Sequence, residues 1–195
     1  MSLYDEAVER FQEILRQARE TGTPEHDAMT LATVRSDGRP SARTVLLKAV
    51  DRRGFVFYTN RHSRKGEQLA SNPNAALCFY WAELGRQIQV EGVVEDVGDA
   101  EADAYFASRP RLSQLGAWAS RQSQPLSHPE MLIEEVRRVD ERYAGSEVPR
   151  PPFWGGYRVV PRLLEFWASR EGRLHVRERY EREDSGRWTH YHLHP

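Results

Sequence analysis

Lysine, cysteine and long apolar runs are scarce in this chain of 195 residues, and it has no excess of basic charge. Its 28 basic and 29 acidic residues leave a formal net charge of -1, which argues against a generic nucleic-acid coat. No apolar run approaches the roughly 20 residues that span a bilayer. The N-terminal MSLYDEAVER lacks the basic and apolar regions of a secretory signal. We therefore expect a cytoplasmic protein of one domain, residues 1–195, that binds neither nucleic acid nor a membrane.

Metal-ligating residues are also sparse. Cys78 is the only cysteine, so it has no partner for an intramolecular disulfide and cannot build a cysteine metal site. His190, His192 and His194 alternate and could share one face of a strand. Because no cysteine or closely spaced acidic ligand accompanies them, the pattern favours a solvated edge strand. We predict no metal site.

Only two of the 28 basic residues are lysines, Lys48 and Lys65. Heavy use of arginine can reflect genome composition alone. Lysine, however, is a compact and mobile ammonium group, whereas arginine is a planar fork, so the two serve different purposes. The two lysines therefore mark the segments to inspect first.

Hydrophobic periodicity predicts a mainly β (α+β) fold. A helix is expected over 3–20, within the N-terminal segment 1–22, and further helices over 63–71, 99–109 and 128–144, the last with a capping box that begins at Ser127. Runs rich in Val, Thr, Leu and aromatic residues predict strands at 28–35, 41–50, 55–60, 75–83, 86–97, 158–169, 173–183 and 187–195. The segment 147–157 is rich in Pro and Gly and predicts a loop. About eight strands in hairpins, with peripheral helices, favour a small barrel because closure removes exposed edges.

Basic residues gather in one predicted strand and at the start of the helix that follows. Arg43 and Lys48 are five positions apart, so they project to opposite faces of a strand unless a bulge intervenes. Ser63, Arg64 and Lys65 stand at a predicted helix start, where backbone N–H groups and the helix dipole favour an anion. This chemistry suits a phosphate monoester. A solvated basic helix start is the alternative interpretation.

Tyr105, Arg109 and Ser113 follow one another at intervals of four residues. They would share one face of a continuous helix, but Pro110 predicts a break, so they could instead surround a corner between a helix and a loop. A phenol, a guanidinium and a hydroxyl can all donate hydrogen bonds to phosphate oxygens. A tyrosine packed in the core beside a surface arginine is the alternative.

Arg173, His175 and Arg177 alternate with Leu174 and Val176 in a predicted strand. The three polar side chains would then share one face. Two arginines beside a histidine are costly to bury without anionic partners. This face is therefore either solvated or in contact with a negatively charged ligand.

From about Met29 to the C-terminus, the chain resembles the pyridoxine (pyridoxamine) 5′-phosphate oxidase family. The motifs that carry the resemblance are, in order, RTVLLK, FYTN with SRK, RQIQVEG, YFASRPRLSQLGAWAS, QSQ, FWGGYRV, and EFW with RLHVR. The resemblance implies an FMN-binding split β-barrel with peripheral helices, working as a homodimer with FMN at the subunit interface. It also implies oxidation of pyridoxamine or pyridoxine 5′-phosphate to pyridoxal 5′-phosphate, in which O2 is reduced to H2O2 and the amine substrate releases ammonia.

The resemblance also implies roles for individual residues. FMN contacts would be Arg43, Thr44, Val45, Leu46, Leu47, Lys48, Tyr58, Thr59, Arg64, Lys65, Gln87, Gln122, Ser123, Trp167 and Arg177. Substrate contacts would be Lys48, Tyr105, Arg109, Ser113, Arg173, Leu174 and His175. Arg173 and His175 would be catalytic, and the C-terminal strands over 156–195 would complete the active site.

Some positions depart from the family pattern. In the family, a longer N-terminal segment usually helps to cover the substrate, whereas this sequence begins nearly at the first predicted helix. In addition, Val176, Ala168 and His192 stand where more polar or basic residues are usual. Two alternative functions therefore stay open. One is an FMN split-barrel oxidoreductase with a different substrate, and the other is a non-catalytic protein that binds flavin or pyridoxal phosphate.

Overall fold

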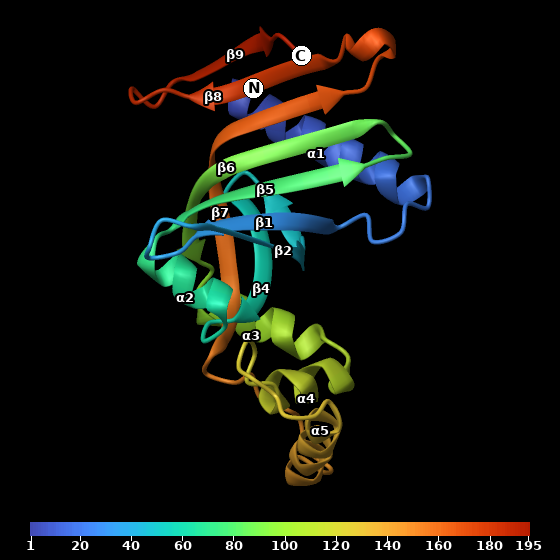
Figure 1. Cartoon of the computed structure of the whole chain (residues 1–195), viewed down its shortest axis with the longest axis vertical. Helices are drawn as coiled ribbons and strands as arrows, with labels where there is room; N and C mark the ends of the chain where they lie inside the picture. The colour runs from blue at the N-terminus through green and yellow to red at the C-terminus, as the bar shows by residue number, and fades with distance from the viewer.

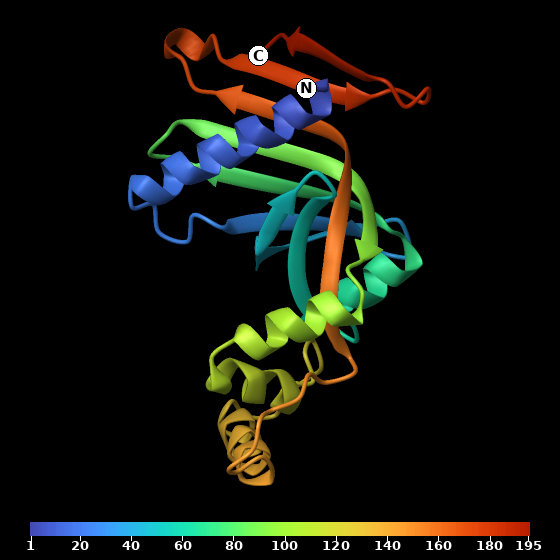
Figure 2. The same cartoon turned by 180° about the vertical axis from the view of Figure 1, so that it is seen from behind.

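The N-terminal amphipathic pattern forms helix α1, Leu3–Glu20, in the computed structural model, which describes residues 1–195. A capping box starts the helix: the Ser2 hydroxyl accepts from the backbone N–H of Asp5, and the Asp5 carboxylate accepts from that of Ser2. On the buried face of α1, the Phe11 ring centroid lies 4.7 Å from that of Phe55 and 4.9 Å from that of Phe79. Helix α1 thus covers one face of the sheet (Figure 2).

All nine strands form one sheet, in which every pair is antiparallel. The hydrogen-bonded order is β2-β1-β5-β6-β7-β4-β3, and β8 and β9 extend the sheet beside β7. The strands are β1 (Ala28–Val34), β2 (Pro40–Leu46), β3 (Ala49–Asp51), β4 (Gly54–Asn60), β5 (Asn74–Trp81), β6 (Arg86–Asp96), β7 (Trp154–Ala168), β8 (Val176–Arg182) and β9 (Trp188–Leu193). A core of apolar side chains fills the space between this sheet and α1.

A β-bulge between β6 and β7 bends the sheet. The register shifts between Glu91, which is opposite Leu163, and Gly92, which is opposite Pro161, so Arg162 is the extra residue on β7. Proline has no N–H to donate to a neighbouring strand. The bulge therefore lies where a regular ladder would lack a hydrogen-bond donor. A Cβ atom on Gly92 would lie 2.1 Å from the Val160 carbonyl oxygen, so only glycine fits the close approach. The sheet curls into a half-barrel (Figure 1).

Four more helices follow α1: α2 (Arg64–Ser71), α3 (Asp99–Ser108), α4 (Arg111–Ala119) and α5 (Glu130–Arg142). Helices α3 to α5 gather at the end of the molecule opposite β8 and β9 in both views (Figures 1 and 2). They enclose a second, smaller apolar cluster that includes Phe106, Leu115, Val139 and Trp154. None of the helices is both long enough and apolar enough to cross a bilayer.

The sequence patterns placed most of these elements correctly, and the exceptions have identifiable causes. The predicted strand 41–50 is two strands, because the ladder of β2 stops at Leu46 and β3 starts at Ala49. The predicted helix 128–144 is shorter, and the expected capping box at Ser127 is absent, since Pro129 precedes the first helical residue without a side-chain cap. Helix α4 was missed because Pro110 was interpreted only as a stop signal, although proline is also favourable at helix starts.

Two C-terminal predictions were also wrong. The predicted loop 147–157 already contains the start of β7, at Trp154, because two glycines can pair in a strand as well as form a turn. The predicted strand 173–183 begins only at Val176. Arg173 lies instead in a short 3-10 turn, Glu171–Arg173, and has a left-handed φ of 60°. The expected alternation of Arg173 with His175 along a strand therefore does not exist.

Candidate active site

A cavity of about 590 Å³ lies where the ends of β2 and β4 meet helices α3 and α4. Its volume falls within the range of small-molecule binding sites. We call it the α3–α4 cavity. It is lined by Thr44, Val45, Leu46, Lys48, Tyr58, Thr59, Asn60, Lys65, Tyr105, Arg109, Pro110, Ser113, Gly116, Ala117, Ser120, Gln122 and Trp154. It therefore brings together residues from five of the motifs: RTVLLK, FYTN with SRK, YFASRPRLSQLGAWAS, QSQ and FWGGYRV.

Tyr105, Arg109 and Ser113 reach the cavity from a corner between two helices. Helix α3 ends at Ser108 and α4 begins at Arg111, so the chain turns at Pro110. All three side chains nevertheless line the same cavity. The predicted break at Pro110 therefore forms, but a second helix follows it where a loop was expected.

Three aromatic rings stack along one wall of the cavity. The ring of Tyr58 lies 4.0 Å from that of Tyr105 and 5.3 Å from that of Trp154, with interplanar angles of 16° and 7°. The Arg109 guanidinium carbon lies 4.8 Å from the centroid of the Trp154 ring. These rings form a firm wall, and the arginine lies against its end.

Arg109 has no anionic partner within the chain. Its Nη1 atom is buried and has no hydrogen-bond partner. Burial lowers the pKa of the Arg109 guanidinium, and the only opposing influence is Tyr105. A buried donor without an acceptor is costly, so this group suits an anion that enters the cavity.

A second group of cations surrounds the start of α2. The Arg43 guanidinium donates to the Leu31 carbonyl oxygen at 3.0 Å and to the Gln68 side-chain oxygen at 2.9 Å, and makes no ion pair. Burial lowers the pKa of Lys65, and the charge of Arg43 lowers it further. Burial likewise lowers the pKa of Arg43, with the charge of Arg64 adding to the effect. Like charges gathered without carboxylates are typical of a site for a strong anion.

The loop after α4 closes over this group. The Gln122 side-chain oxygen accepts from the Thr59 hydroxyl at 3.1 Å and from the Lys65 ammonium at 2.8 Å. The Ser123 hydroxyl accepts from the backbone N–H of Arg64 at 3.2 Å. Thus residues about sixty positions apart form one polar cluster at the N-terminus of α2.

Helix α2 itself is positioned by Ser63. This side chain is fully buried, accepts from the Gly66 backbone N–H at 3.3 Å and donates to the Asn60 carbonyl oxygen at 2.6 Å. A Cβ atom on Gly66 would lie 2.2 Å from the Arg61 carbonyl oxygen, so glycine allows α2 to approach the end of β4. The cap and the glycine together direct the first turn of α2 toward Thr59.

The two lysines that line the α3–α4 cavity have different partners, because Lys65 donates to Gln122 and Lys48 does not. Lys48 donates to the Asp27 carboxylate at 2.8 Å, between β2 and β3. Leu47, next to it, is buried in the main core and does not line the cavity. The break between β2 and β3 thus sends these neighbours in different directions.

The remaining predicted residues lie elsewhere in the protomer. Gln87 and Trp167 are paired neighbours on β6 and β7 and line a separate cavity of about 160 Å³ beside α1. On the adjacent strand, Arg177 donates to the Glu165 carboxylate at 2.8 Å and to the His194 carbonyl oxygen at 3.0 Å. Neither residue group touches the α3–α4 cavity.

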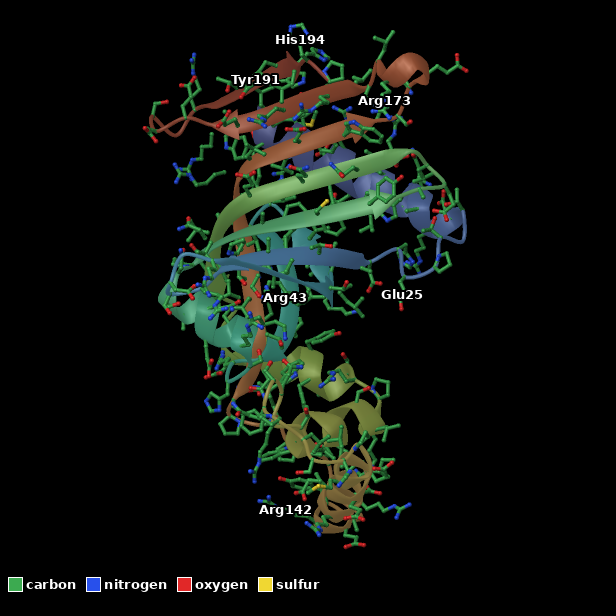
Figure 3. All side chains as sticks on the ribbon, viewed as in Figure 1. Glu25, Arg43, Arg142, Arg173, Tyr191 and His194 are labelled. Carbon is green, nitrogen blue, oxygen red and sulfur yellow. The ribbon has the colours of Figure 1, made fainter.

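Arg173, Leu174 and His175 are also outside the α3–α4 cavity. Arg173 and Leu174 are exposed, and His175 accepts from the Arg170 backbone N–H at 3.2 Å. Figure 3 shows Arg173 beside the β8–β9 end of the sheet, whereas Arg43 lies near the middle of the molecule. The residues implied by the family resemblance therefore divide into two separate sets within one chain.

Sequence reasoning missed Trp154, which lines the cavity and touches Arg109. The signal was present in FWGG, but its Pro- and Gly-rich surroundings were interpreted as a loop. Asn60 and Ser120 were missed too, and no spacing in the sequence distinguishes them.

Comparison with known proteins gives an independent result. Residues 14–142 match the model of the family described as pyridoxamine 5′-phosphate oxidase, and residues 154–195 match a pyridoxine 5′-phosphate oxidase C-terminal dimerisation region. A pyridoxine/pyridoxamine 5′-phosphate oxidase of Myxococcus xanthus strain DK1622 is 56% identical over 188 residues, covering 96% of this chain and 91% of the relative. One from Alkalilimnicola ehrlichii is 52% identical over 197 residues, covering 100% of both.

Solved structures show similar folds. PhzG from Burkholderia lata 383, in complex with tetrahydrophenazine-1-carboxylic acid, has a TM-score of 0.91 and 34% identity, covering 96% of this chain and 92% of that one. A pyridoxamine 5′-phosphate oxidase-related, FMN-binding protein from Nostoc punctiforme PCC 73102 has a TM-score of 0.79 at 18% identity, covering 100% and 99%, which supports the split-barrel fold. The sequence identities and the matched family models together establish that this chain belongs to the pyridoxamine 5′-phosphate oxidase family.

Proposed function

We propose that this protein oxidises pyridoxamine 5′-phosphate and pyridoxine 5′-phosphate to pyridoxal 5′-phosphate with FMN as cofactor and O2 as acceptor. The alcohol and O2 give the aldehyde and H2O2, and the amine additionally consumes water and releases ammonia. One observation carries the proposal: in a member of this family, Arg109 and Lys65 border one cavity without carboxylate partners, and two more unpaired cations, Arg43 and Arg64, lie close to Lys65. Two phosphorylated ligands, a flavin and a pyridine, would supply the missing negative charges.

The donor set fits FMN. Arg43, Arg64 and Lys65 surround the capped start of α2, where the helix dipole also favours a phosphate. Thr59 and Gln122 add neutral polar groups beside Lys65. When bound, FMN supplies a ring that accepts a hydride, which no side chain of this protein can do.

On this proposal, the opposite side of the cavity holds the substrate phosphate. Arg109 offers an unpaired buried donor, and Lys48, Tyr105 and Ser113 add an ammonium and two hydroxyl groups. The stacked rings would exclude water from this wall. Arg173 and His175 would then orient the pyridine ring, a role carried over from the family motif RLHVR.

A homodimer would join the two separate sets of residues. Gln87, Trp167, Arg173, His175 and Arg177 lie outside the α3–α4 cavity of their own protomer. All except Gln87 fall in the segment that matches a dimerisation region. We therefore propose that each cavity is completed by this second set from the other subunit.

The direct test uses the purified protein with bound flavin. We expect a flavin absorption spectrum, together with O2 uptake and H2O2 formation when either phosphorylated substrate is added. Arg109→Ala should reduce kcat/KM about a hundredfold, the effect of losing charge-assisted hydrogen bonds to a phosphate. An inactive preparation that added FMN cannot restore would refute the proposal.

A second candidate is a related oxidoreductase with another substrate, because the similar PhzG structure contains tetrahydrophenazine-1-carboxylic acid. The same assay with pyridoxamine, pyridoxine and that acid separates the candidates. We expect activity only with the 5′-phosphates. Tight binding of pyridoxal 5′-phosphate without H2O2 formation would instead indicate a non-catalytic binding protein.

A further inference from the structure

We propose that Trp154 is a positioning residue that holds Arg109 in the orientation required for binding the substrate phosphate. This inference rests on the proposed function, since it assigns a task to a residue beside the proposed phosphate site. Trp154 would act through its contact with the Arg109 guanidinium and would not itself bind the phosphate.

The Arg109 guanidinium lies against two aromatic rings, those of Trp154 and Phe106. Trp154 is the first residue of β7, is paired with Asn60 of β4, and is only 6% exposed. The Arg109 guanidinium carbon lies 4.8 Å from the Trp154 ring centroid and 5.4 Å from that of Phe106. The Trp154 ring is itself almost parallel to those of Tyr58 and Tyr105, at 7° and 9°. This stacking restricts the orientation of the Trp154 ring that contacts Arg109.

Arg111, two residues further along, shows the alternative way to hold an arginine. Its guanidinium donates to the Asp140 carboxylate at 2.8 Å and 3.1 Å and to the carbonyl oxygens of Tyr143 and Ser146. Those acceptors occupy its N–H groups. An aromatic face attracts a guanidinium without occupying any N–H donor, so Arg109 can be fixed and still offer its donors to an anion.

The backbone of Trp154 is tied to the helix that precedes Arg109. Arg150 donates to the Trp154 carbonyl oxygen at 2.6 Å, and it pairs with Asp99 at 2.8 Å and Asp103 at 2.5 Å, both on α3. A single arginine thus sets the spacing between the start of β7 and α3. The ring and the guanidinium are held by the same scaffold.

The test measures binding of pyridoxal 5′-phosphate and of pyridoxal to the flavin-loaded protein by calorimetry. Trp154→Leu should weaken binding of the phosphate ester about tenfold and leave pyridoxal unchanged, because a partly desolvated cation–π contact is lost. Trp154→Phe should weaken it about threefold, since phenylalanine is a poorer partner. In an Arg109→Ala background, Trp154→Leu should add less than about twofold, because the contact it removes is already gone.

Trp118→Leu is the matched control. Trp118 belongs to the same apolar cluster and carries its own arginine, Arg142, at 5.5 Å, away from the cavity. We expect unchanged affinity for the phosphate ester in this variant. If it weakens binding as much as Trp154→Leu does, the effect is general loss of packing and the inference is overturned.

Two further outcomes are distinguishable. If the wild-type protein binds pyridoxal 5′-phosphate no better than pyridoxal, the proposed function fails. If the wild type prefers the ester and Arg109→Ala abolishes the preference, but Trp154→Leu keeps it, only the positioning role fails. Should Trp154→Leu not fold, Trp154→Phe decides: an unchanged affinity overturns the role, and a threefold loss supports it.

Discussion

At the scale of single residues, the partners of a cation separate structural from ligand-binding positions. Arg158 is buried and binds the carboxylates of Asp51 and Glu101, so its charge is balanced within the fold. Arg109 and Lys65 border a cavity and have no carboxylate. Counting charged residues in the sequence cannot distinguish a cation that is paired within the fold from one that has no carboxylate partner.

Lys48 allows a sharp test at this scale. Lys48 lines the α3–α4 cavity, and its ammonium group donates to the Asp27 carboxylate at 2.8 Å. Lys48→Arg should lower kcat/KM for pyridoxine 5′-phosphate about tenfold, since the larger planar fork cannot reproduce the contacts of a compact ammonium. Steady-state kinetics would reveal this. Unchanged kinetics would mean that the rarity of lysine reflects composition alone.

At the scale of elements, strand β7 organises β8 through one carboxylate. Glu165 has a side chain 3% exposed and binds Arg177 at 2.7 Å and Arg179 at 2.8 Å, both on β8. Burial alone would raise the pKa of Glu165, but hydrogen bonds from Arg179 and Arg177 lower it below its usual value of 4.5. The charged carboxylate therefore stabilises this strand pair.

The sign of the pH dependence follows from that lowered pKa. A carboxyl whose pKa is lower in the folded state stabilises the protein above its unfolded pKa, and this contribution is lost as the pH falls through the folded pKa. Glu165→Gln should cost about 2 kcal/mol of unfolding free energy at pH 7. In urea titrations, the difference in unfolding free energy between wild type and Glu165→Gln should become smaller as the pH falls below about 4.5. A difference in unfolding free energy that does not change with pH would contradict the ion-pair explanation.

Which elements were predictable depended on how local their determinants are. Helix α1 and the alternating strands β1, β5 and β6 follow from periodicity and caps within each segment. The turn at Glu171–Arg173 was not predictable, because the alternation in RLHVR looks like a strand until pairing with β7 is known. Strand pairing is a long-range property that local patterns do not contain.

At the scale of the whole molecule, the implied site residues form two sets in one protomer. The α3–α4 cavity contains Lys65 and Arg109, whereas Arg177 lies on β8 with Glu165. A homodimer with a two-fold axis would bring one set from each subunit to each of two sites. Matched residues 154–195 support such a dimer.

Subunit complementation tests this arrangement. Lys65→Gln and Arg177→Gln should each abolish most activity as pure homodimers. When the two variants are unfolded together and refolded as a random mixture, half of the dimers are mixed and each has one intact site, so activity should return to roughly a quarter of wild type. Size-exclusion chromatography confirms the dimer, and refolded single variants serve as controls. No recovery would show that both residues act within one subunit.

The sequence by itself determined the β-rich class, the amphipathic α1, the capped α2 and the motifs of the family, because each depends on neighbouring residues. Only the tertiary structure decided which cations lack partners and which residues share a cavity. It placed Tyr105, Arg109 and Ser113 around a corner with Trp154, more than forty residues further along the chain, and separated them from Arg173. The physical reason is that burial, charge pairing and cavity formation depend on contacts between distant segments, and these exist only once the sheet has curled.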